Sequence, residues 1–351
     1  MSMPNHVAET AAPTGPAPAA IPATMRALCI SSVTPASEAQ LSNVPVPAVA
    51  PGRVLIRVRG FGLNHSEQML RTGKIRAPYI KKPCVPGIEC VGEVDDPGGT
   101  ELAAGQPVCA LMGGMGRSFW GSYAEYALVP AHHVFAIPRE LIDHLGWAEL
   151  AAIPETYYTA WGSLFEGLRL APDDTLLVRG ATCALGEVAI QLSRAVGARV
   201  IATTHREERL PELEKQLGAR DVATLDTGEL AGRLDDYRVT KALELVGPAT
   251  LADTMRCLVP GGICCSTGVL GGVDELNGFD PITGIPNGTY LTGFYSNYPT
   301  QRIMDDIFAF ILEHELRPHV GARYGFTHLP EALAAQDRGG TRGKIVVTMD
   351  D

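Results

Sequence analysis

The chain has 351 residues, of which 46% are hydrophobic and 19% charged, and its formal net charge is −10 at pH 7. That length suffices for two domains with hydrophobic cores, and the acidic balance argues against non-specific binding to nucleic acid or anionic membranes. No run of eighteen apolar residues occurs, so the sequence predicts no membrane span.

The first 24 residues and the cysteines bear on the cellular compartment of the protein. Residues 1–24 are rich in Ala and Pro and lack both a periodic apolar face and the basic start and apolar run of a signal peptide. We expect a disordered tail there. The eight cysteines are scattered without a C-x-x-C pair, which argues against a disulfide framework or a four-cysteine zinc lobe. Reduced thiols and no export signal predict a cytoplasmic protein.

Residues 25–150 read as short strands broken by Gly and Pro, with no long helix between them. The strand-like stretches are "MRALCI", "RVLIRVRGFGL", "CVGEV", "QPVCALM" and "SYAEYALVP". This pattern predicts an antiparallel, barrel-like β domain.

The pattern changes near residue 148, where "WAELAAIPETYYTAWGSLFEGL" has helical spacing. Apolar strands and helices then alternate, including a helix expected near 229–236. Alternation of this kind predicts a parallel sheet with helices on both faces. The last strand, helix and strand (322–350) could close either domain. We assign 25–150 and 316–351 to the first domain and 151–315 to the second.

The most informative stretch is "TLLVRGATCALGEVAIQLSRAVGARVIATT" (175–204). An apolar strand runs into Gly180, a helix with one apolar face begins near Leu185, Gly197 ends it, and a second strand follows. This strand–turn–helix–strand unit is typical of a dinucleotide site, because the turn and the helix N-terminus direct N–H groups toward a pyrophosphate. An ordinary crossover in a parallel sheet is the alternative. The predicted turn comprises Gly180, Ala181, Thr182, Cys183, Ala184, Leu185 and Gly186.

The end of the second strand bears on the choice between NAD and NADP. Enzymes that bind NAD usually place an acid at this strand tip, to accept from the ribose 2′-hydroxyl. Here the strand ends with Thr203 and Thr204, and Arg206 and Arg209 follow. Threonine and arginine suit a 2′-phosphate, so these four residues predict NADPH. A solvated helix start is the alternative for Arg209.

Several stretches in one order resemble the medium-chain dehydrogenase/reductase superfamily, over about residues 25–349. They are "PGIECVGEV", "GSYAEYALVP", "TAWGSL", "LVRGATCALG", "LVPGGICCSTGVLGG" and "TRGKIVV". The resemblance implies a GroES-like antiparallel β-barrel domain and a Rossmann domain with a doubly wound parallel sheet. It also implies a homodimer.

Compared with the zinc alcohol dehydrogenases of that superfamily, the chain lacks the metal ligands. Asn64 stands where they have a ligand cysteine, and Ile88 stands where they have a ligand histidine. His65 takes the place of a second-shell histidine. Zinc needs three or four converging N, S or O ligands, so we predict no metal. A new site built from His65, Glu67 and Glu89 is the alternative. The chain therefore resembles the zinc-independent quinone oxidoreductase branch, which has an asparagine at the Asn64 position.

The resemblance also implies roles near the nicotinamide. Asn64 would donate to the substrate oxygen or hold the cofactor amide, and Thr159 would contact that amide. Simpler alternatives are a turn residue for Asn64, a helix hydroxyl for Thr159 and a surface lysine for Lys344. The implied cofactor contacts are Asn64, Thr159, Val246, Gly268, Val269, Phe294 and Lys344.

One position departs from relatives that reduce enoyl thioesters or quinones. They often have a tyrosine after the glycine of "RTG", where this chain has Ile75 after an intervening lysine, and Tyr79 follows four residues on. We predict that Tyr79 substitutes as a catalytic donor; water or a different substrate class are the alternatives.

These features predict an NADPH-dependent, zinc-independent oxidoreductase that transfers hydride to a small quinone or α,β-unsaturated carbonyl. One alternative is an enoyl reductase acting on a polyketide or acyl intermediate. Another is a non-enzymatic protein that binds NADPH and serves as a partner or sensor.

Overall fold

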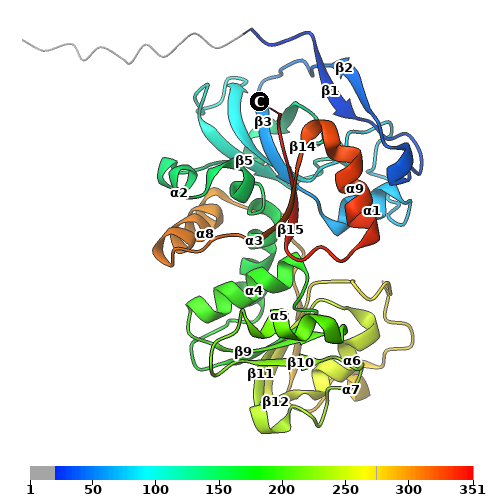
Figure 1. The fold of residues 1–351 in the computed structure, drawn as a ribbon, viewed down its shortest axis with the longest axis vertical. Helices are drawn as coiled ribbons and strands as arrows, with labels where there is room; N and C mark the ends of the chain where they lie inside the picture. The colour runs from blue at the N-terminus through cyan, green and yellow to red at the C-terminus, as the bar shows by residue number, and fades with distance from the viewer. Residues whose placement is uncertain (1–19, 274, 351) are drawn as a thin grey trace, which may run out of the picture.

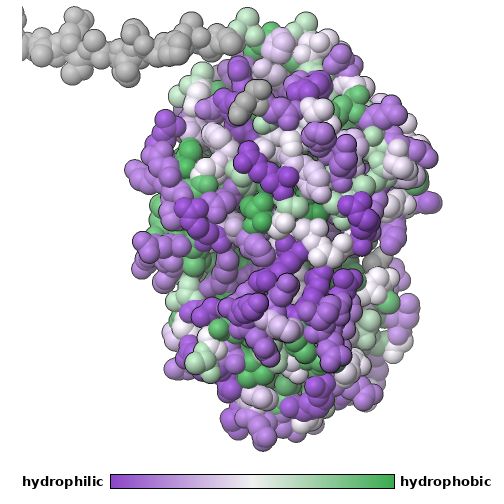
Figure 2. Space-filling model, viewed as in Figure 1, coloured by the Kyte–Doolittle hydropathy of each residue, from purple (hydrophilic) through white to green (hydrophobic). Residues whose placement is uncertain are grey.

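The computed structural model describes residues 20–273 and 275–350, which form two lobes around two large β-sheets (Figure 1). Of the tail expected over 1–24, residues 1–19 lie outside the described residues, and Thr24 is the first residue of β1 (Thr24–Leu28). Within the described residues, no helix is both long and apolar enough to cross a membrane. The face in Figure 2 is mostly hydrophilic, with small, separate hydrophobic areas.

The first lobe is built on a seven-stranded sheet in the order β14-β15-β3-β4-β5-β7, with β6 also paired to β3. Its pairs are antiparallel except β14 with β15, which confirms the antiparallel β domain expected from the short strands. A two-stranded β1–β2 ribbon lies beside it. The strands are β2 (Leu41–Pro45), β3 (Arg53–Gly62), β4 (Glu89–Asp96), β5 (Pro107–Leu111), β6 (Tyr126–Pro130), β7 (Val134–Ala136), β14 (Val320–Gly325) and β15 (Lys344–Thr348). The helices of this lobe are η1 (Ala36–Glu38), α1 (His65–Arg71), η2 (Ala131–His133), α2 (Arg139–Leu150), η6 (Phe326–His328) and α9 (Leu329–Arg338).

The second lobe is built on a six-stranded sheet in the order β10-β9-β8-β11-β12-β13, in which every pair is parallel. This order starts in the middle and runs outward in two directions, as a doubly wound sheet does, and confirms the second predicted domain type. The strands are β8 (Thr175–Arg179), β9 (Arg199–Thr204), β10 (Val222–Leu225), β11 (Val239–Glu244), β12 (Leu258–Ser266) and β13 (Tyr290–Gly293). The helices are α3 (Pro154–Trp161), η3 (Gly162–Gly167), α4 (Ala184–Ala195), η4 (Glu207–Arg209), α5 (Leu210–Glu214), η5 (Asp235–Tyr237), α6 (Pro248–Arg256), α7 (Pro281–Gly284) and α8 (Gln301–Glu313).

The helix expected near 229–236 is wrong: the segment is a loop that ends in the short η5. Leu230 and Leu234 are buried, so their helical spacing comes from a loop that packs two side chains into the core. The backbone N–H groups of Leu230 and Ala231 donate to the Asp253 carboxylate, and Gly232 has a φ of 79°. A carboxylate from α6 therefore satisfies two backbone donors of this loop.

A buried arginine holds the tips of the central parallel strands. Arg179, the last residue of β8, is fully buried; its guanidinium donates to Asp226 beyond β10 and to Asp253 on α6. It also donates to the Thr254 hydroxyl, 3.0 Å away. Because Arg179 directly precedes Gly180, this network fixes the point where the glycine turn leaves the sheet.

Replacing Arg179 with Met should lower the free energy of unfolding by about 3–5 kcal/mol, since two buried carboxylates lose their cation. Urea unfolding would measure this. The matched control is Arg256→Met, because Arg256 also pairs with Asp253 but its side chain is 58% exposed. The control should cost less than about 1 kcal/mol. Equal losses in the two variants would contradict the role given to burial.

Candidate active site

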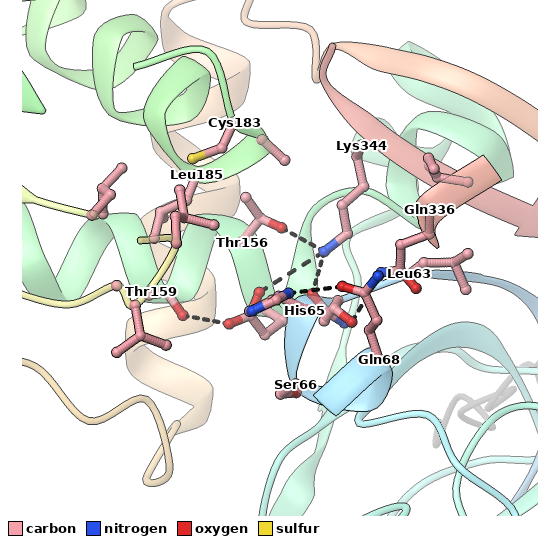
Figure 3. Close-up of a pocket in the computed structure, with 18 of the residues that line it drawn as sticks. Leu63, His65, Ser66, Gln68, Thr156, Thr159, Cys183, Leu185, Gln336 and Lys344 are labelled. Carbon is pink, nitrogen blue, oxygen red and sulfur yellow. Dashed lines mark hydrogen bonds and ion pairs between the residues drawn. The ribbon is translucent and has the colours of Figure 1, made fainter. Parts of the chain in front are cut away.

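A cavity of about 450 Å³ lies where the carboxyl ends of the parallel strands meet α1, α3 and β15 (Figure 3). Its lining includes side chains from both lobes, and its surface is more apolar than polar. Of the residues predicted from sequence, those that line it are Asn64, Thr159, Cys183, Ala184, Leu185, Gly268, Val269, Phe294 and Lys344. Predicted residues outside the lining are Tyr79, Gly180, Ala181, Thr182, Gly186, Thr203, Thr204, Arg206, Arg209 and Val246.

The glycine turn presents the N-terminus of α4 to this cavity. Gly180 has a φ of 88°, and its N–H donates to the Thr203 hydroxyl oxygen, 3.2 Å away on β9. Cys183 caps α4, since its Sγ accepts from the Gly186 N–H. A Cβ on Gly186 would lie 2.6 Å from the Ala181 carbonyl oxygen, so only glycine lets α4 pack this closely on the turn. Burial raises the pKa of the Cys183 thiol to about 11, so the thiol stays neutral beside any phosphate.

The opposite wall is formed by the tip of β12 and by β13. A Cβ on Gly268 would lie 2.3 Å from the Leu245 carbonyl oxygen, so only glycine lets this segment pack against the end of β11. Phe294 packs edge-on against Tyr158, with ring centroids 5.6 Å apart, over the space that Gly162 leaves. An open helix N-terminus opposite a flat glycine-rich wall fits a bound dinucleotide.

The tip of β9 has the composition that the sequence indicated. Thr204 is buried and its hydroxyl accepts from the Arg206 N–H, 3.2 Å away. The Arg206 guanidinium contacts the neighbouring His205 ring, whereas the Arg209 guanidinium donates to the Gly340 carbonyl at 2.7 Å. Arg209 therefore ties η4 to the loop before β15, and Arg206 is the arginine better placed for a phosphate beside the strand tip.

A buried lysine organises the base of the cavity. The Lys344 ammonium donates to Asn64 Oδ1 at 2.5 Å and to Thr156 Oγ1 at 2.7 Å, and lies 2.9 Å from Glu89 Oε1. These three acceptors use all three ammonium protons. The Glu89 carboxylate also accepts from Asn64 Nδ2 at 2.8 Å and from the Glu155 N–H at 2.7 Å. We call Asn64, Glu89, Glu155, Thr156 and Lys344 the lysine cluster.

Strand register explains why these residues meet. β15 runs antiparallel to β3 with Val346 opposite Gly62, which brings Lys344 beside Asn64, just beyond the end of β3. A Cβ on Gly62 would lie 2.2 Å from Lys344 Cε and 2.7 Å from Glu89 Oε1. Gly62 therefore leaves the space through which the lysine stem and the glutamate approach each other.

Negative charge exceeds positive charge here. Glu67 is buried on α1 and accepts from the Ile88 N–H at 3.0 Å. Burial raises the pKa of Glu67. The positive charge of Arg117 lowers it by a smaller amount, so the net shift is upward. Burial likewise raises the pKa of Glu155, and the Lys344 charge only partly offsets this. The charges of Lys344 and Arg117 thus only partly offset the effect of burial on the pKa values of Glu155 and Glu67.

Two predicted donors are placed differently from what their roles require. Both amide hydrogens of Asn64 have protein acceptors in Glu89 and Glu67, at 2.8 and 3.3 Å, so donation to a substrate would break an existing bond. Tyr79 is 52% exposed in the loop between α1 and β4 and does not line the cavity. The loop carries its hydroxyl to the surface, and we do not retain Tyr79 as the donor.

Sequence reasoning missed Glu155, Thr156 and the pairing of Glu89 with Lys344. The available signal was charge in apolar surroundings: Glu89 begins the strand "ECVGEV", and Glu155 follows the proline that starts α3. Acids at such positions are seldom fully buried without a partner. The sequence did not show which cation would pair with them.

Two family models and several known proteins are similar to this chain. Residues 50–139 match the alcohol dehydrogenase GroES-like domain, and residues 217–347 match a family described as zinc-binding dehydrogenase. A quinone oxidoreductase from Lama guanicoe is 28% identical over 320 residues, covering 88% of this chain and 92% of the relative. A 2-haloacrylate reductase from a Burkholderia species is 28% identical over 241 residues, covering 66% of this chain and 70% of the relative.

The chain is also similar to a segment of a polyketide synthase and to a solved structure. The polyketide synthase GfsB of Streptomyces halstedii is 26% identical over 326 residues, which are 90% of this chain but 6% of that protein. The solved structure of AibC has a TM-score of 0.82 with 23% identity, covering 94% of this chain and 97% of AibC, a likeness of fold. The chain belongs to the medium-chain dehydrogenase/reductase superfamily. Membership implies a nicotinamide cofactor, and the turn and wall described above fit one.

Zinc, which the second family description implies, does not fit the residues present. Across residues 20–273 and 275–350, no group of three or more His, Cys, Asp or Glu is arranged to hold a metal. The space between Asn64 and Glu89 is taken by the Lys344 ammonium, and Ile88 offers no donor atom. A second cation there would meet direct repulsion from the lysine.

Replacing Lys344 with Met should destabilise the fold by about 3–5 kcal/mol at pH 8, because Glu89 loses its cation in a buried site. The loss should shrink toward pH 5. The folded pKa of Glu155 is raised above its unfolded value, so stability from this group is present below about pH 4.3 and falls as pH rises through the raised pKa. Removing the ammonium raises that pKa further and steepens the fall.

Urea unfolding at pH 5 and pH 8 measures the difference. The control is Lys215→Met, an exposed lysine after α5, which should change stability by less than about 0.5 kcal/mol at both pH values. A Lys344→Met loss that does not vary with pH would contradict the charge balance described for the cluster.

Proposed function

We propose that the protein is an NADPH-dependent, zinc-independent oxidoreductase that transfers hydride to a quinone or an α,β-unsaturated carbonyl. The supporting observation is that a dinucleotide-type turn borders a site whose central cation is Lys344. The Lys344 ammonium is bound by the Glu89 carboxylate and the Asn64 side-chain amide. A metal dehydrogenase polarises an alcohol or carbonyl oxygen with its ion. Acceptors that take hydride readily need less of that polarisation.

The protein's part is binding and orientation. The N-terminus of α4 would hold the pyrophosphate through N–H groups of Ala184 and Leu185, and the flat wall at Gly268 would admit the nicotinamide ribose. The bound nicotinamide supplies the hydride. Thr159 lines the cavity on the same face of α3 as Glu155 and is placed to contact the cofactor amide or the acceptor. The apolar side chains of Met69, Leu270 and Phe294 would exclude water from the reacting atoms.

An acyl or polyketide enoyl intermediate is the second candidate acceptor. The match to a polyketide synthase segment supports it, and so does the likeness to a reductase named for a haloacrylate, which is itself an α,β-unsaturated acid. A role as a non-enzymatic NADPH-binding partner or sensor is the third candidate. We also keep the homodimer and the cytoplasmic location as proposals.

The test of function is NADPH oxidation by EDTA-treated protein with ortho- and para-quinones, simple enones and an enoyl thioester in parallel. We expect turnover that survives the chelator and is highest with a quinone or an enone. A preference for the thioester would favour the second candidate. Activity that vanishes and returns with zinc would contradict the proposal, and NADPH binding without oxidation of any acceptor would favour the third.

The cofactor preference is tested by Arg206→Ala. A charged hydrogen bond to phosphate contributes about 1.5–3 kcal/mol, so NADPH affinity should fall roughly tenfold or more while NADH affinity hardly changes. Fluorescence titration with both cofactors measures this. Arg302→Ala on the exposed start of α8 is the charge-matched control and should alter neither affinity. Equal affinity of the unmodified protein for NADH and NADPH would refute the preference.

A further inference from the structure

Glu155 is the only aspartate or glutamate among the described residues that lines the cavity. It is the second residue of α3, directly after the proline that starts the helix. Its own N–H is bound to Glu89, so the helix start is anchored to the lysine cluster while the Glu155 side chain faces the cavity. The Glu155 side chain is 19% exposed, and it lines the cavity.

The two carboxyl oxygens of Glu155 face different neighbours. Oε1 accepts from the Thr159 hydroxyl at 2.9 Å, one helical turn along α3. Oε2 lies 3.8 Å from the Lys344 ammonium, beyond hydrogen-bond length but close enough for a strong charge interaction. The group therefore has a hydroxyl on its cavity side and a cation behind it.

The surroundings of Glu155 act on its pKa in both directions. Burial raises the pKa of Glu155, and the carboxylates of Glu89 on β4 and Glu67 on α1 raise it further. Lys344 on β15 and the Thr159 hydroxyl act in the opposite direction. Because Lys344 is at hand, loss of the proton leaves a carboxylate that the ammonium stabilises.

Other titratable groups of the lining suit proton donation less well. All three Lys344 protons have acceptors in the cluster. The Cys183 thiol accepts from Gly186 and has a pKa raised to about 11. Tyr295 is 71% exposed, and the exposed His65 ring contacts Gln68 through Nδ1 at 2.9 Å. Of these, His65 is the serious competitor.

We propose that Glu155 is the proton donor of the reduction; this rests on the proposed function. A bound nicotinamide would supply the hydride that forms a C–H bond at the β-carbon of the acceptor, so the cofactor would be oxidised and the acceptor reduced. The C=C pair shifts toward the carbonyl. The Glu155 O–H bond breaks and its proton bonds the α-carbon, or an oxygen in a quinone. Water reprotonates the carboxylate.

The experiment compares Glu155→Gln, Glu155→Asp and the control Glu149→Gln in the full chain. Glu149 lies on α2 with its carboxylate on Arg317, outside the cavity. Glu155→Gln should lower kcat about 10²–10³-fold, as loss of a general acid does, with a Kd for NADPH within about threefold of the unmodified protein. Glu155→Asp should have a kcat between those of Glu155→Gln and the unmodified protein. Glu149→Gln should have the kcat of the unmodified protein.

Two further readouts separate proton donation from structural support. The kcat of the unmodified protein should fall at high pH as Glu155 ionises, and that fall should disappear in Glu155→Gln. Infrared spectra of the protein without cofactor, recorded as pH rises, should show a protonated carboxyl band that persists above the usual pKa range of a glutamate and that Glu155→Gln lacks. Thermal unfolding and NADPH binding verify that each variant is folded.

The possible outcomes distinguish failure of Glu155 as donor from failure of the proposed function. An unmodified protein that turns over while Glu155→Gln keeps its kcat and pH profile overturns the proposal and leaves the proposed function standing. Loss of rate in His65→Asn with a normal rate in Glu155→Gln would move the role to His65. If the unmodified protein binds NADPH but reduces nothing, the proposed function itself fails, and Glu155 as donor fails with it.

Discussion

The site depends on a single buried ammonium group. An unpaired charge in this position would cost several kcal/mol, so Lys344 must have acceptors for all of its protons. Asn64, Thr156 and Glu89 provide them from three different elements. Once that requirement is met, β15 is held beside β3, and the start of α3 is held against β4 through the Glu155 N–H. The cavity base is therefore held together by contacts within the protein itself.

The same constraint reaches the glycine turn by a second route. Glu187 on α4 is buried and pairs with Arg342 and His319, each at 2.6 Å. Arg342 lies two residues before Lys344, so the helix that begins at the cofactor turn is tied to the strand that carries the lysine. On the far side of the turn, Arg179 ties β8 to Asp226 and Asp253. Ion pairs with a buried member thus flank the turn on both sides.

An ammonium at this position changes what the fold can do chemically. A metal ion would have free coordination positions for substrate, whereas an ammonium whose protons are all used has none to offer. Burial raises the pKa of the neighbouring Glu155, and the Lys344 charge instead acts to lower it. This arrangement suits reactions in which the cofactor provides the reducing power and the protein provides a proton and a shaped, largely apolar cavity.

Local patterns determined much of this protein from its sequence alone. The strand–turn–helix unit around Gly180, the alternation that makes the parallel sheet, and the threonines at the end of β9 all follow from periodicity and from turn chemistry over a few residues. The same kind of pattern failed at 229–236, because two leucines one turn apart can be buried by a loop as well as by a helix. Periodicity reports which side chains are buried, and it does not report what satisfies the backbone.

Only the tertiary structure decided the lysine cluster and the exclusion of Tyr79. Asn64 and Lys344 are 280 positions apart in sequence, and they meet because of the register of β15 on β3 and the space at Gly62. Strand register is set by the packing of the whole sheet, so residue types near each end of the chain cannot reveal it. The sequence identified Asn64 and Lys344 as candidate site residues but not Glu155 or Thr156, and the fold determined which residues are close enough to act together.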